Sequence, residues 1–253
     1  GRLYREEAAR AALPEDSFTG NFRQDWLLER QDEEFARADG VVVLSELAKR
    51  SLVAEGVAAS KIRVSWPGVD AERFRPVSPD RVEKRRPFRV VQVSSLTPAK
   101  GLHVLLDAWR RLGWQDAELW LVGAGEVPPG LPASVVAQGP VPQTALGELI
   151  SRCDVFVLPS IADGFGLVVL QAMAAGLPVV VSDQCGAAEA VQGARYARVT
   201  RAGDPEQLAA VLEEFRLRGM EECRDLGQEA RRDAIARFTW EHHVARLGWS
   251  AKT

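Results

Sequence analysis

The stretch LPSIADGFGLVVLQAMAAGLPVVVSDQCGAAE, residues 158–189, decides the fold of this chain. It opens with a short polar loop, residues 159–164, and continues with a segment of helical spacing that runs to about Ala175. Gly176 is a typical helix terminator, and the β-branched run 179–181 predicts a buried strand. A glycine-bearing loop before a helix presents backbone N–H groups without partners inside the helix, so this unit is suited to binding anions or hydroxyl groups.

Two polar side chains in this stretch are placed to share one cleft. Asp163 lies at the end of the loop, and Gln171 follows eight residues later, one to two turns into the helix. At that spacing Gln171 lies on a helix face that can look toward the same cleft as Asp163. One strand–loop–helix unit therefore offers a carboxylate, a carboxamide and free backbone donors.

The order of residues in this stretch carries a family resemblance. The matching positions are Pro159, Ser160, Gly164, Phe165, Gly166, Leu167, Ala172, Met173, Ala174, Gly176, Pro178, Val179 and Glu189. In that order they resemble the signature of group-1 (family 4) nucleotide-sugar glycosyltransferases of the GT-B fold, roughly P-S-x-x-E-G-F-G-L-x-x-x-E-A-M-A-x-G-x-P-V-V, then a Gly-Gly loop and a Glu. Three positions depart, because Asp163 and Gln171 stand where the pattern has Glu, and Cys185 stands for the first Gly of the loop.

Composition limits the class of protein. The 253 residues carry a net charge of −3 and are 46% hydrophobic, which is typical of a soluble globular protein and gives no reason to expect nucleic acid as a partner. Three scattered cysteines favour a reducing, cytoplasmic compartment, and none has metal-ligand spacing. No run has transmembrane length and no signal-peptide pattern opens the chain. The first residue, Gly1, is not Met, so we expect a piece of a longer protein.

The chain before residue 75 resembles the end of the family's N-terminal, acceptor-binding domain. Residues 1–20 are weakly specified, and residues 22–38 predict a charged amphipathic helix. Beyond them the sequence predicts strand 41–44, helix 46–55 capped by Ser45, strand 62–64 and a turn at 68–70. The matching positions are Ala38, Asp39, Ser45, Gly56, Lys61, Ile62, Val64, Pro67, Gly68, Val69, Asp70 and Phe74.

This resemblance implies four parts. Residues 1–74 are the close of the N-terminal domain, 75–87 are a proline- and charge-rich linker, 88–238 are a Rossmann-like nucleotide-sugar-binding domain, and 239–253 are a terminal helix that crosses back to the first domain. A complete first domain would need roughly 100–150 more residues upstream. The first domain is therefore expected to be only partly present.

The segment from residue 88 onward alternates strands and helices, which predicts βαβ units and an α/β fold. We expect a parallel sheet with helices on both faces, binding its ligand at the carboxyl ends of the strands. The predicted strands are 88–93, 118–122, 134–138, 154–158, 179–181 and 195–199. The predicted helices are 101–112, 143–152, 165–175, 205–217, 221–237 and 239–252.

The loop after the first of these strands, VSSLTPAKG, is the expected diphosphate site. The family pattern G-R-L-x-x-x-K-G is matched at Lys100 and Gly101, while Ser94 and Ser95 replace Gly-Arg. The resemblance implies that Lys100 neutralises the donor diphosphate and that the serines supply neutral donors only. With Ser95, one guanidinium and its bidentate grip are lost.

The resemblance assigns the remaining donor contacts. The loop of Gly123 and Gly125 lies beside the nucleotide in the family, and the backbone near Val141 holds the base edge. Asp163, predicted with Lys100 to be catalytic, is expected to contact hydroxyls of the donor sugar, and Gln171 the hydroxyls of the ribose. Loop backbone groups are expected to meet sugar hydroxyls or phosphate at Gly164, Phe165, Gly166 and Leu167.

Plainer interpretations stay open at each position. Lys100 and Asp163 read alone are solvated residues, Gln171 is a buried and satisfied amide, and the glycine and Val141 segments are ordinary turns. Glu189 is expected to cap a helix and close a loop.

None of the three histidines is predicted to be a general base. His103 is expected at the surface behind Lys100, and the other two lie in the terminal helix: His242 and His243.

The predicted function is hexosyl transfer from a nucleotide-diphosphate sugar to a sugar, lipid-linked or small-molecule acceptor hydroxyl. By resemblance it is retaining and independent of metal, with no cofactor besides the donor substrate. The alternative is a degenerate, non-catalytic nucleotide-sugar-binding or interaction module, motivated by the three changed polar positions. A sugar-nucleotide epimerase of similar fold is disfavoured by the upstream segments. Transfer is expected to need the missing first domain, and peripheral membrane contact stays open.

Overall fold

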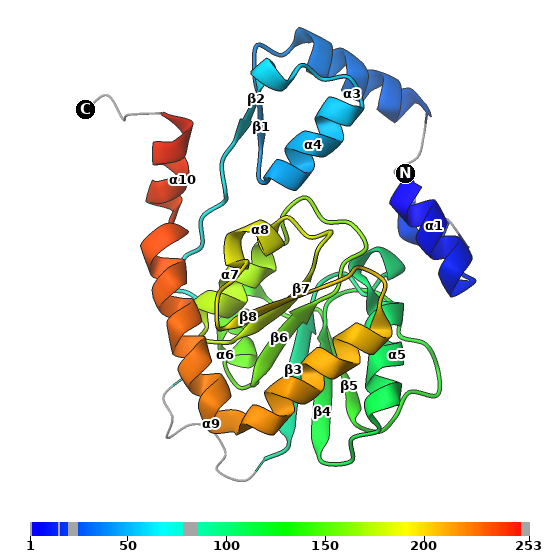
Figure 1. Ribbon diagram of the computed structural model, residues 1–253, viewed down its shortest axis with the longest axis vertical. Helices are drawn as coiled ribbons and strands as arrows, with labels where there is room; N and C mark the ends of the chain where they lie inside the picture. The colour runs from blue at the N-terminus through cyan, green and yellow to red at the C-terminus, as the bar shows by residue number, and fades with distance from the viewer. Residues whose placement is uncertain (1, 15, 20–24, 78–85, 249–253) are drawn as a thin grey trace.

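The computed structural model describes residues 2–14, 16–19, 25–77 and 86–248. This described part contains two parallel sheets (Figure 1). A two-stranded sheet pairs β1 (Val41–Val43) with β2 (Ile62–Val64). A six-stranded sheet has the order β5-β4-β3-β6-β7-β8. We call the two-stranded sheet with helices α3 and α4 the small lobe, and the six-stranded sheet with its helices the large lobe.

The large sheet confirms the predicted α/β fold. Its strands are β3 (Phe88–Val93), β4 (Ala117–Val122), β5 (Val135–Gly139), β6 (Val155–Leu158), β7 (Val179–Ser182) and β8 (Ala197–Thr200). Numbered along the chain, this order is 3-2-1-4-5-6, the doubly wound Rossmann order, which reverses direction between β3 and β6. Strands β6 and β7 are buried at every position, as expected for a parallel sheet covered on both faces.

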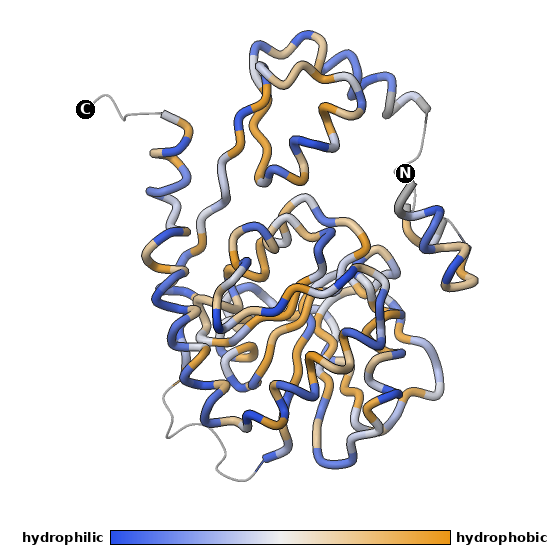
Figure 2. The backbone as a smooth tube through the Cα atoms, viewed as in Figure 1, coloured by the Kyte–Doolittle hydropathy of each residue, from blue (hydrophilic) through white to orange (hydrophobic). Residues whose placement is uncertain are grey.

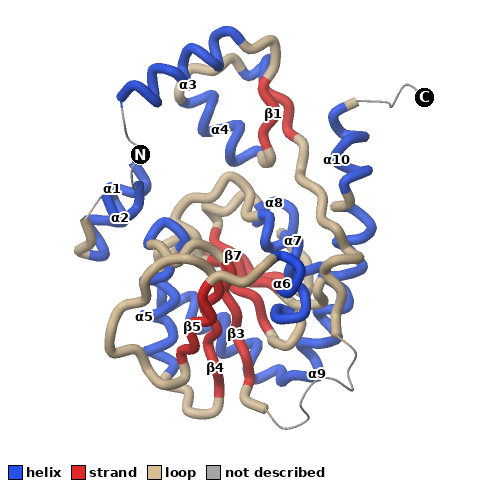
Figure 3. The backbone as a smooth tube through the Cα atoms, turned by 180° about the vertical axis from the view of Figure 1, so that it is seen from behind, coloured by secondary structure: helices blue, strands red, loops and turns tan. Residues whose placement is uncertain are grey.

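Helices cover both faces of this sheet (Figures 1 and 3). Helix α5 (Leu102–Leu112) and the first part of α9 (Pro205–Arg237) lie on one face, and α6 (Gln143–Ile150), α7 (Leu167–Ala174) and α8 (Ala187–Val191) lie on the other, where the later part of α9 packs against α7. The two helices predicted at 205–217 and 221–237 form one element that is interrupted at Gly219, where φ is 79°. Helix α8 was not predicted, because its five residues are too short for a periodic signal. Figure 2 shows apolar residues gathered along the strands.

The small lobe adds α3 (Asp25–Arg37), α4 (Glu46–Ala54) and the 3₁₀ turn η2 (Ala59–Lys61). Ser45 caps α4 as predicted, since its Oγ accepts a hydrogen bond from the Ala48 N–H at 3.0 Å.

Helix α10 (Trp240–Leu247) runs back along the small lobe, where the Nδ1 of His243 lies 2.9 Å from the Oγ of Ser65. It ends at Gly248 in the left-handed conformation, earlier than the predicted end at 252. The predicted helix end, residues 249–252, lies outside the described residues.

Two chain crossings join the lobes, and they lie side by side. The N–H of Val69 donates to the carbonyl of Phe238 at 2.7 Å. A Cβ on Gly68 would lie 2.5 Å from the Cα of Trp240, so only glycine allows this approach.

Residues 1–20 differ from the expectation of weak structure. They form α1 (Arg2–Ala11) and α2 (Asp16–Thr19), which pack at the start of α5 in the large lobe. Phe18 is buried there, and the carboxylate of Glu7 lies 2.6 Å from the Nε2 of His103. His103 is therefore mostly buried, 20% exposed, rather than at the surface. The sequence did not reveal this because the docking face of α1 includes a charged residue, Glu7, whose burial depends on partners elsewhere in the chain.

None of the helices in the described ranges is long and apolar enough to span a membrane. All three cysteines are buried free thiols: Cys153, Cys185 and Cys223.

Candidate functional site

A cavity of about 670 Å³ lies between the two lobes. It opens at the carboxyl ends of β3 and β6, where the strand order reverses and where doubly wound sheets bind their ligands. Its lining comprises Val43, Leu44, Ala48, Val93, Ser94, Lys100, Gln143, Leu146, Leu158, Asp163, Gly164, Phe165, Gly166, Leu167, Val168 and Gln171.

Lys100 and Asp163 face one another in this cavity. The Nζ of Lys100 lies 2.6 Å from the Oδ2 of Asp163, and the side chains are 30% and 12% exposed. Neither residue is therefore the freely solvated side chain of the plainer interpretation. Of the described residues that line the cavity, these are the only two with charged side chains, and their charges are opposite, so its lining has no net charge. Among the described ranges, no cluster of three or more His, Cys, Asp or Glu is arranged to hold a metal ion.

The loop after β3 holds Lys100 through its backbone. Lys100 ends a 3₁₀ turn, η4 (Pro98–Lys100), and its carbonyl accepts a hydrogen bond from the Nε2 of Gln92 at 2.8 Å. Gly101 follows with φ of 72°, and a Cβ there would lie 2.0 Å from the carbonyl oxygen of Pro159. The Lys-Gly pair thus lets the loops after β3 and β6 touch. Sequence analysis missed Gln92, since a buried amide inside a strand carries no motif.

The loop after β6 fixes Asp163 from both sides. Its N–H donates to the carbonyl of Gln184 at 2.9 Å, and its carbonyl accepts from the N–H of Gly186 at 3.0 Å. Its Oδ1 accepts from the N–H of Phe165 at 3.2 Å. This contact corrects the expectation that the Phe165 N–H faces the donor, because an Asp at this position closes a local turn with its own backbone.

Helix α7 begins at Leu167, and Gly166 precedes it in the left-handed conformation with φ of 78° and no side-chain cap. Gln171 lies on the face of α7 that lines the cavity, as its spacing from Asp163 predicted. The two polar side chains of the signature and the start of one helix therefore share one space.

Cys185 supports this loop instead of the glycine of the family pattern. Its Sγ donates to the carbonyl of Phe165 at 3.0 Å, and the side chain is buried. Burial, and after it the nearby carboxylate of Asp163, raise the pKa of this thiol to about 12. Cys185 therefore acts here as a neutral hydrogen-bond donor.

Four predicted donor-binding residues do not line the cavity: Ser95, Gly123, Gly125 and Val141. The two glycines have a packing reason, because a Cβ on Gly123 would lie 1.7 Å from the carbonyl oxygen of Ser94, and one on Gly125 would lie 2.8 Å from that of Leu96. Ser95 is exposed. Donor contacts by these four residues stay predictions.

The small lobe forms part of the cavity wall with Val43, Leu44 and Ala48. These apolar residues carry no chemical signal and so could not be selected from the sequence, and neither could Gln143 of α6.

Glu189 is a helix cap as expected, but the helix that it caps belongs to the small lobe. Its Oε2 accepts from the N–H of Glu46 at the start of α4 at 2.8 Å.

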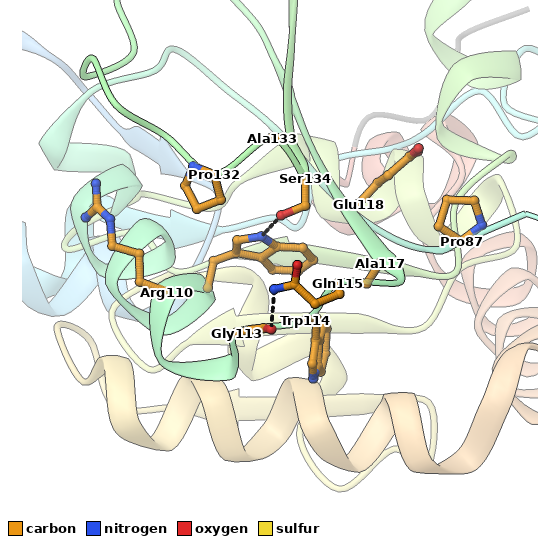
Figure 4. Close-up of a pocket in the computed structure, with 11 residues that line it drawn as sticks. Pro87, Arg110, Gly113, Trp114, Gln115, Ala117, Glu118, Pro132, Ala133 and Ser134 are labelled. Carbon is orange, nitrogen blue, oxygen red and sulfur yellow. Dashed lines mark hydrogen bonds between the residues drawn. The ribbon is translucent and has the colours of Figure 1, made fainter.

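A second cavity, of about 450 Å³, lies at the amino ends of the strands (Figure 4). The indole Nε1 of Trp109 donates to the Oγ of Ser134 at 3.0 Å, and the amide of Gln115 donates to the carbonyl of Gly113 at 3.0 Å. These two pairs of lining groups are thus bonded to each other, and the cavity lies at the edge of the sheet opposite the Lys100–Asp163 pair.

A doubly wound sheet that faces a second lobe across a cleft at its switch point defines a GT-B-type fold. Residues 87–215 match the family model described as "Glycosyl transferases group 1", and the chain belongs to this family.

Curated relatives and solved structures agree with this assignment. The chain is 30% identical over 196 residues to "Amylovoran biosynthesis glycosyltransferase AmsK" of Erwinia amylovora, covering 70% of this chain and 47% of the relative. It is 32% identical to "MMP alpha-(1->4)-mannosyltransferase" of Mycolicibacterium hassiacum, covering 81% and 51%. The fold matches Anabaena Alr3699/HepE, solved in complex with UDP and glucose, with a TM-score of 0.78 at 22% identity, covering 97% and 74%. The chain therefore spans about half the length of these two curated relatives.

Proposed function

We propose that this chain is the donor-binding part of a glycosyltransferase that moves a sugar from a nucleotide-diphosphate sugar to an acceptor hydroxyl. The observation that carries the proposal is the pair of Lys100 and Asp163, which meet with Gln171 in one cavity at the switch point of the sheet. Relatives named as glycosyltransferases and a neighbour solved with UDP and glucose support it. The acceptor, by analogy with the family, is a sugar, a lipid-linked sugar or a small molecule.

Each group has a part in the proposed reaction. The ammonium of Lys100 stabilises the negative charge that develops on the leaving diphosphate, a contribution that is largest in a partly dry site. Asp163 accepts hydrogen bonds from hydroxyls of the donor sugar and orients its anomeric carbon. Gln171 contacts the ribose hydroxyls. The apolar wall from the small lobe excludes water and brings the acceptor side close, so positioning supplies much of the rate.

We further propose that transfer retains the anomeric configuration and that Lys100 and backbone N–H groups supply the charge compensation. This part rests on the family resemblance at Lys100, Gly101 and the loop before α7. It predicts that turnover by a complete protein is unchanged by a chelator.

A non-catalytic nucleotide-sugar-binding module is the second candidate, and one observation favours it. A diphosphate carries at least two negative charges, yet Lys100 is the only cation among the described lining residues, and Asp163 already pairs with it. Ser95, in the place of the family's arginine, is exposed and outside the cavity. The two candidates differ in turnover rather than in donor binding.

Calorimetric titration with UDP, GDP and ADP, and with matching UDP- and GDP-sugars without added metal, tests the donor site. We expect saturable binding of one nucleotide that Lys100→Ala weakens. Arg111→Ala is the matched control, because it removes one positive charge from the far, exposed end of α5. Equal losses in the two variants, or no binding to a folded chain, would remove the support for a working donor site.

Restoring the family residues tests the residue assignment on which both candidates rest. Ser95→Arg and Gln171→Glu are each expected to tighten binding of the diphosphate or ribose part of the donor. If neither variant changes donor affinity, these positions are outside the site and the residue assignment is wrong.

A further inference from the structure

The small lobe contacts the Asp163 loop through one buried hydroxyl. Ser45 has no exposed surface, and its Oγ donates to the carbonyl of Gly164 at 2.6 Å while accepting from the Ala48 N–H at 3.0 Å. The contact has no spare room, because a Cβ on Gly186 would lie 2.4 Å from the oxygen of Gly164 and 2.5 Å from the Oγ of Ser45. The Ser45 hydroxyl therefore caps α4 in its own lobe and also donates a hydrogen bond across the cleft to the large lobe.

That bond sets the orientation of a peptide in the proposed site. The carbonyl of Gly164 and the N–H of Phe165 belong to one planar trans peptide, so they point in opposite directions. With the carbonyl directed to Ser45, the N–H is directed to the Oδ1 of Asp163, at 3.2 Å. The Oδ2 of the same carboxylate meets Lys100 at 2.6 Å. A continuous line of hydrogen bonds thus runs from the small lobe to the Lys100–Asp163 pair.

A second contact holds α4 in the position that this line requires. The Oε2 of Glu189, on α8 of the large lobe, accepts from the N–H of Glu46 at 2.8 Å, and its Oε1 lies 3.4 Å from the Nη2 of Arg50. A carboxylate is favourable at the start of a helix, where N–H groups lack partners and the helix dipole is positive. Ser45 and Glu189 therefore fasten the same helix end from opposite lobes.

We infer that Ser45 is a positioning residue for the sugar-contacting carboxylate, and that Glu189 seats the helix that presents it. Asp163 then takes its working orientation only when the small lobe is seated on the loop after β6. This inference rests on the proposed function, because it gives the contact a role in holding the donor sugar.

The experiment separates the cross-lobe bond from the helix cap. Ser45→Ala removes both hydrogen bonds. Asp204→Ala is the cap control, since Asp204 caps α9 by accepting from the N–H of Gln207 at 2.9 Å. Glu189→Ala removes the acceptor of the hydrogen bond from the Glu46 N–H, whereas Glu189→Gln retains an oxygen that can accept it.

Two readouts are measured on the 253-residue chain. The first is hydrogen exchange of the Phe165 amide, resolved by NMR. The second is the ratio of affinities for UDP-glucose and UDP, or for GDP-mannose and GDP if the guanine nucleotides bind. We expect Ser45→Ala to speed exchange at Phe165 and to lower affinity for the nucleotide sugar about ten-fold relative to the nucleotide. Glu189→Ala is expected to give a smaller change of the same kind.

The inference is overturned if Ser45→Ala changes neither readout, or if it weakens nucleotide and nucleotide sugar by the same factor. It is also overturned if Asp204→Ala changes the affinity ratio as much, since that would be a general loss of stability. Exchange at Phe165 decides the link between the lobes even if no nucleotide binds, so failure of the proposed function and failure of this inference can be told apart.

Discussion

The two members of the Lys100–Asp163 pair are expected to respond in opposite directions when the ligand is a nucleoside diphosphate. The ammonium of Lys100 lies 2.6 Å from the carboxylate of Asp163. A diphosphate that takes this ammonium must displace the carboxylate and then lie beside its negative charge. Asp163→Asn should therefore tighten UDP binding, whereas Lys100→Met should weaken it.

The magnitude follows from the exposure of the two side chains. Two unit charges about 4 Å apart interact by about 4 kcal/mol at an effective dielectric constant of 20, which is an upper limit here. Because Lys100 is 30% exposed and Asp163 is 12% exposed, solvent screening lowers the net competition to about 1 kcal/mol. That corresponds to roughly five-fold tighter binding for Asp163→Asn. Loss of a charge-assisted hydrogen bond in Lys100→Met costs about 1.5–3 kcal/mol, or roughly 10- to 150-fold.

Calorimetry of UDP, or of whichever nucleoside diphosphate binds the unmodified chain, measures both changes. Asp107→Asn is the control for Asp163→Asn, because it removes an exposed carboxylate from α5 at a distance from the cavity. Both changes in affinity, the gain in Asp163→Asn and the loss in Lys100→Met, should become smaller as the salt concentration is raised, since the competition is electrostatic. Equal weakening by both variants would refute the reasoning and would show that the pair is needed intact for the shape of the site.

Three further predictions concern the stability of the large lobe. Arg86 makes two hydrogen bonds of 2.6 Å to Asp154, with both side chains 4% exposed. Arg86→Met should therefore lower the free energy of unfolding in urea by about 3–5 kcal/mol, and adding Asp154→Leu should recover much of the loss. Gly123→Ala should lower the free energy of unfolding by more than about 2 kcal/mol, because φ is 144° and a Cβ would clash with the carbonyl oxygen of Ser94. The same change at Gly130, where φ is 73° and no atom lies within 4 Å of the added Cβ, should cost about 1 kcal/mol. Equal costs at the two positions would contradict the clash. Hydrogen bonds from Arg198 and then Arg218 hold the pKa of Glu214 at about 2 instead of 4.5. The stability that this carboxylate supplies is present above pH 4.5 and is lost as the pH falls toward 2, so thermal unfolding of Glu214→Gln should show a shallower acid decline over that window.

The sheet could be predicted from sequence because its strands are short β-branched runs separated by segments of helical length. The parallel direction of its strands also followed, since helix-length connections between successive strands give βαβ units. The location of Lys100 and Asp163 in one cavity followed in turn, because both lie after strands that end at the same edge. Helices α1 and α2 could not be placed, since Glu7 is buried only by virtue of its partners at His103 and Arg10.

The details of the candidate site depend on distances that sequence does not contain. The direct pairing of Lys100 with Asp163 arises from the packing of two loops against each other. The contribution of the small lobe was also hidden, because Val43, Leu44 and Ala48 look like any apolar residues. For Glu189, the sequence predicted that the residue caps a helix, but it could not predict which helix.

The paired crossings between the lobes limit how the cleft can change shape. Because the Val69–Phe238 hydrogen bond and the contact of Gly68 with Trp240 join the two crossings, they behave as one pivot rather than two independent tethers. Any displacement of the small lobe relative to the large lobe is therefore a rotation about this joint. The hydrogen bonds from Ser45 to Gly164 and from Glu46 to Glu189 then fix the angle of that rotation. The joint and two hydrogen bonds thus align the lobes without a large interface.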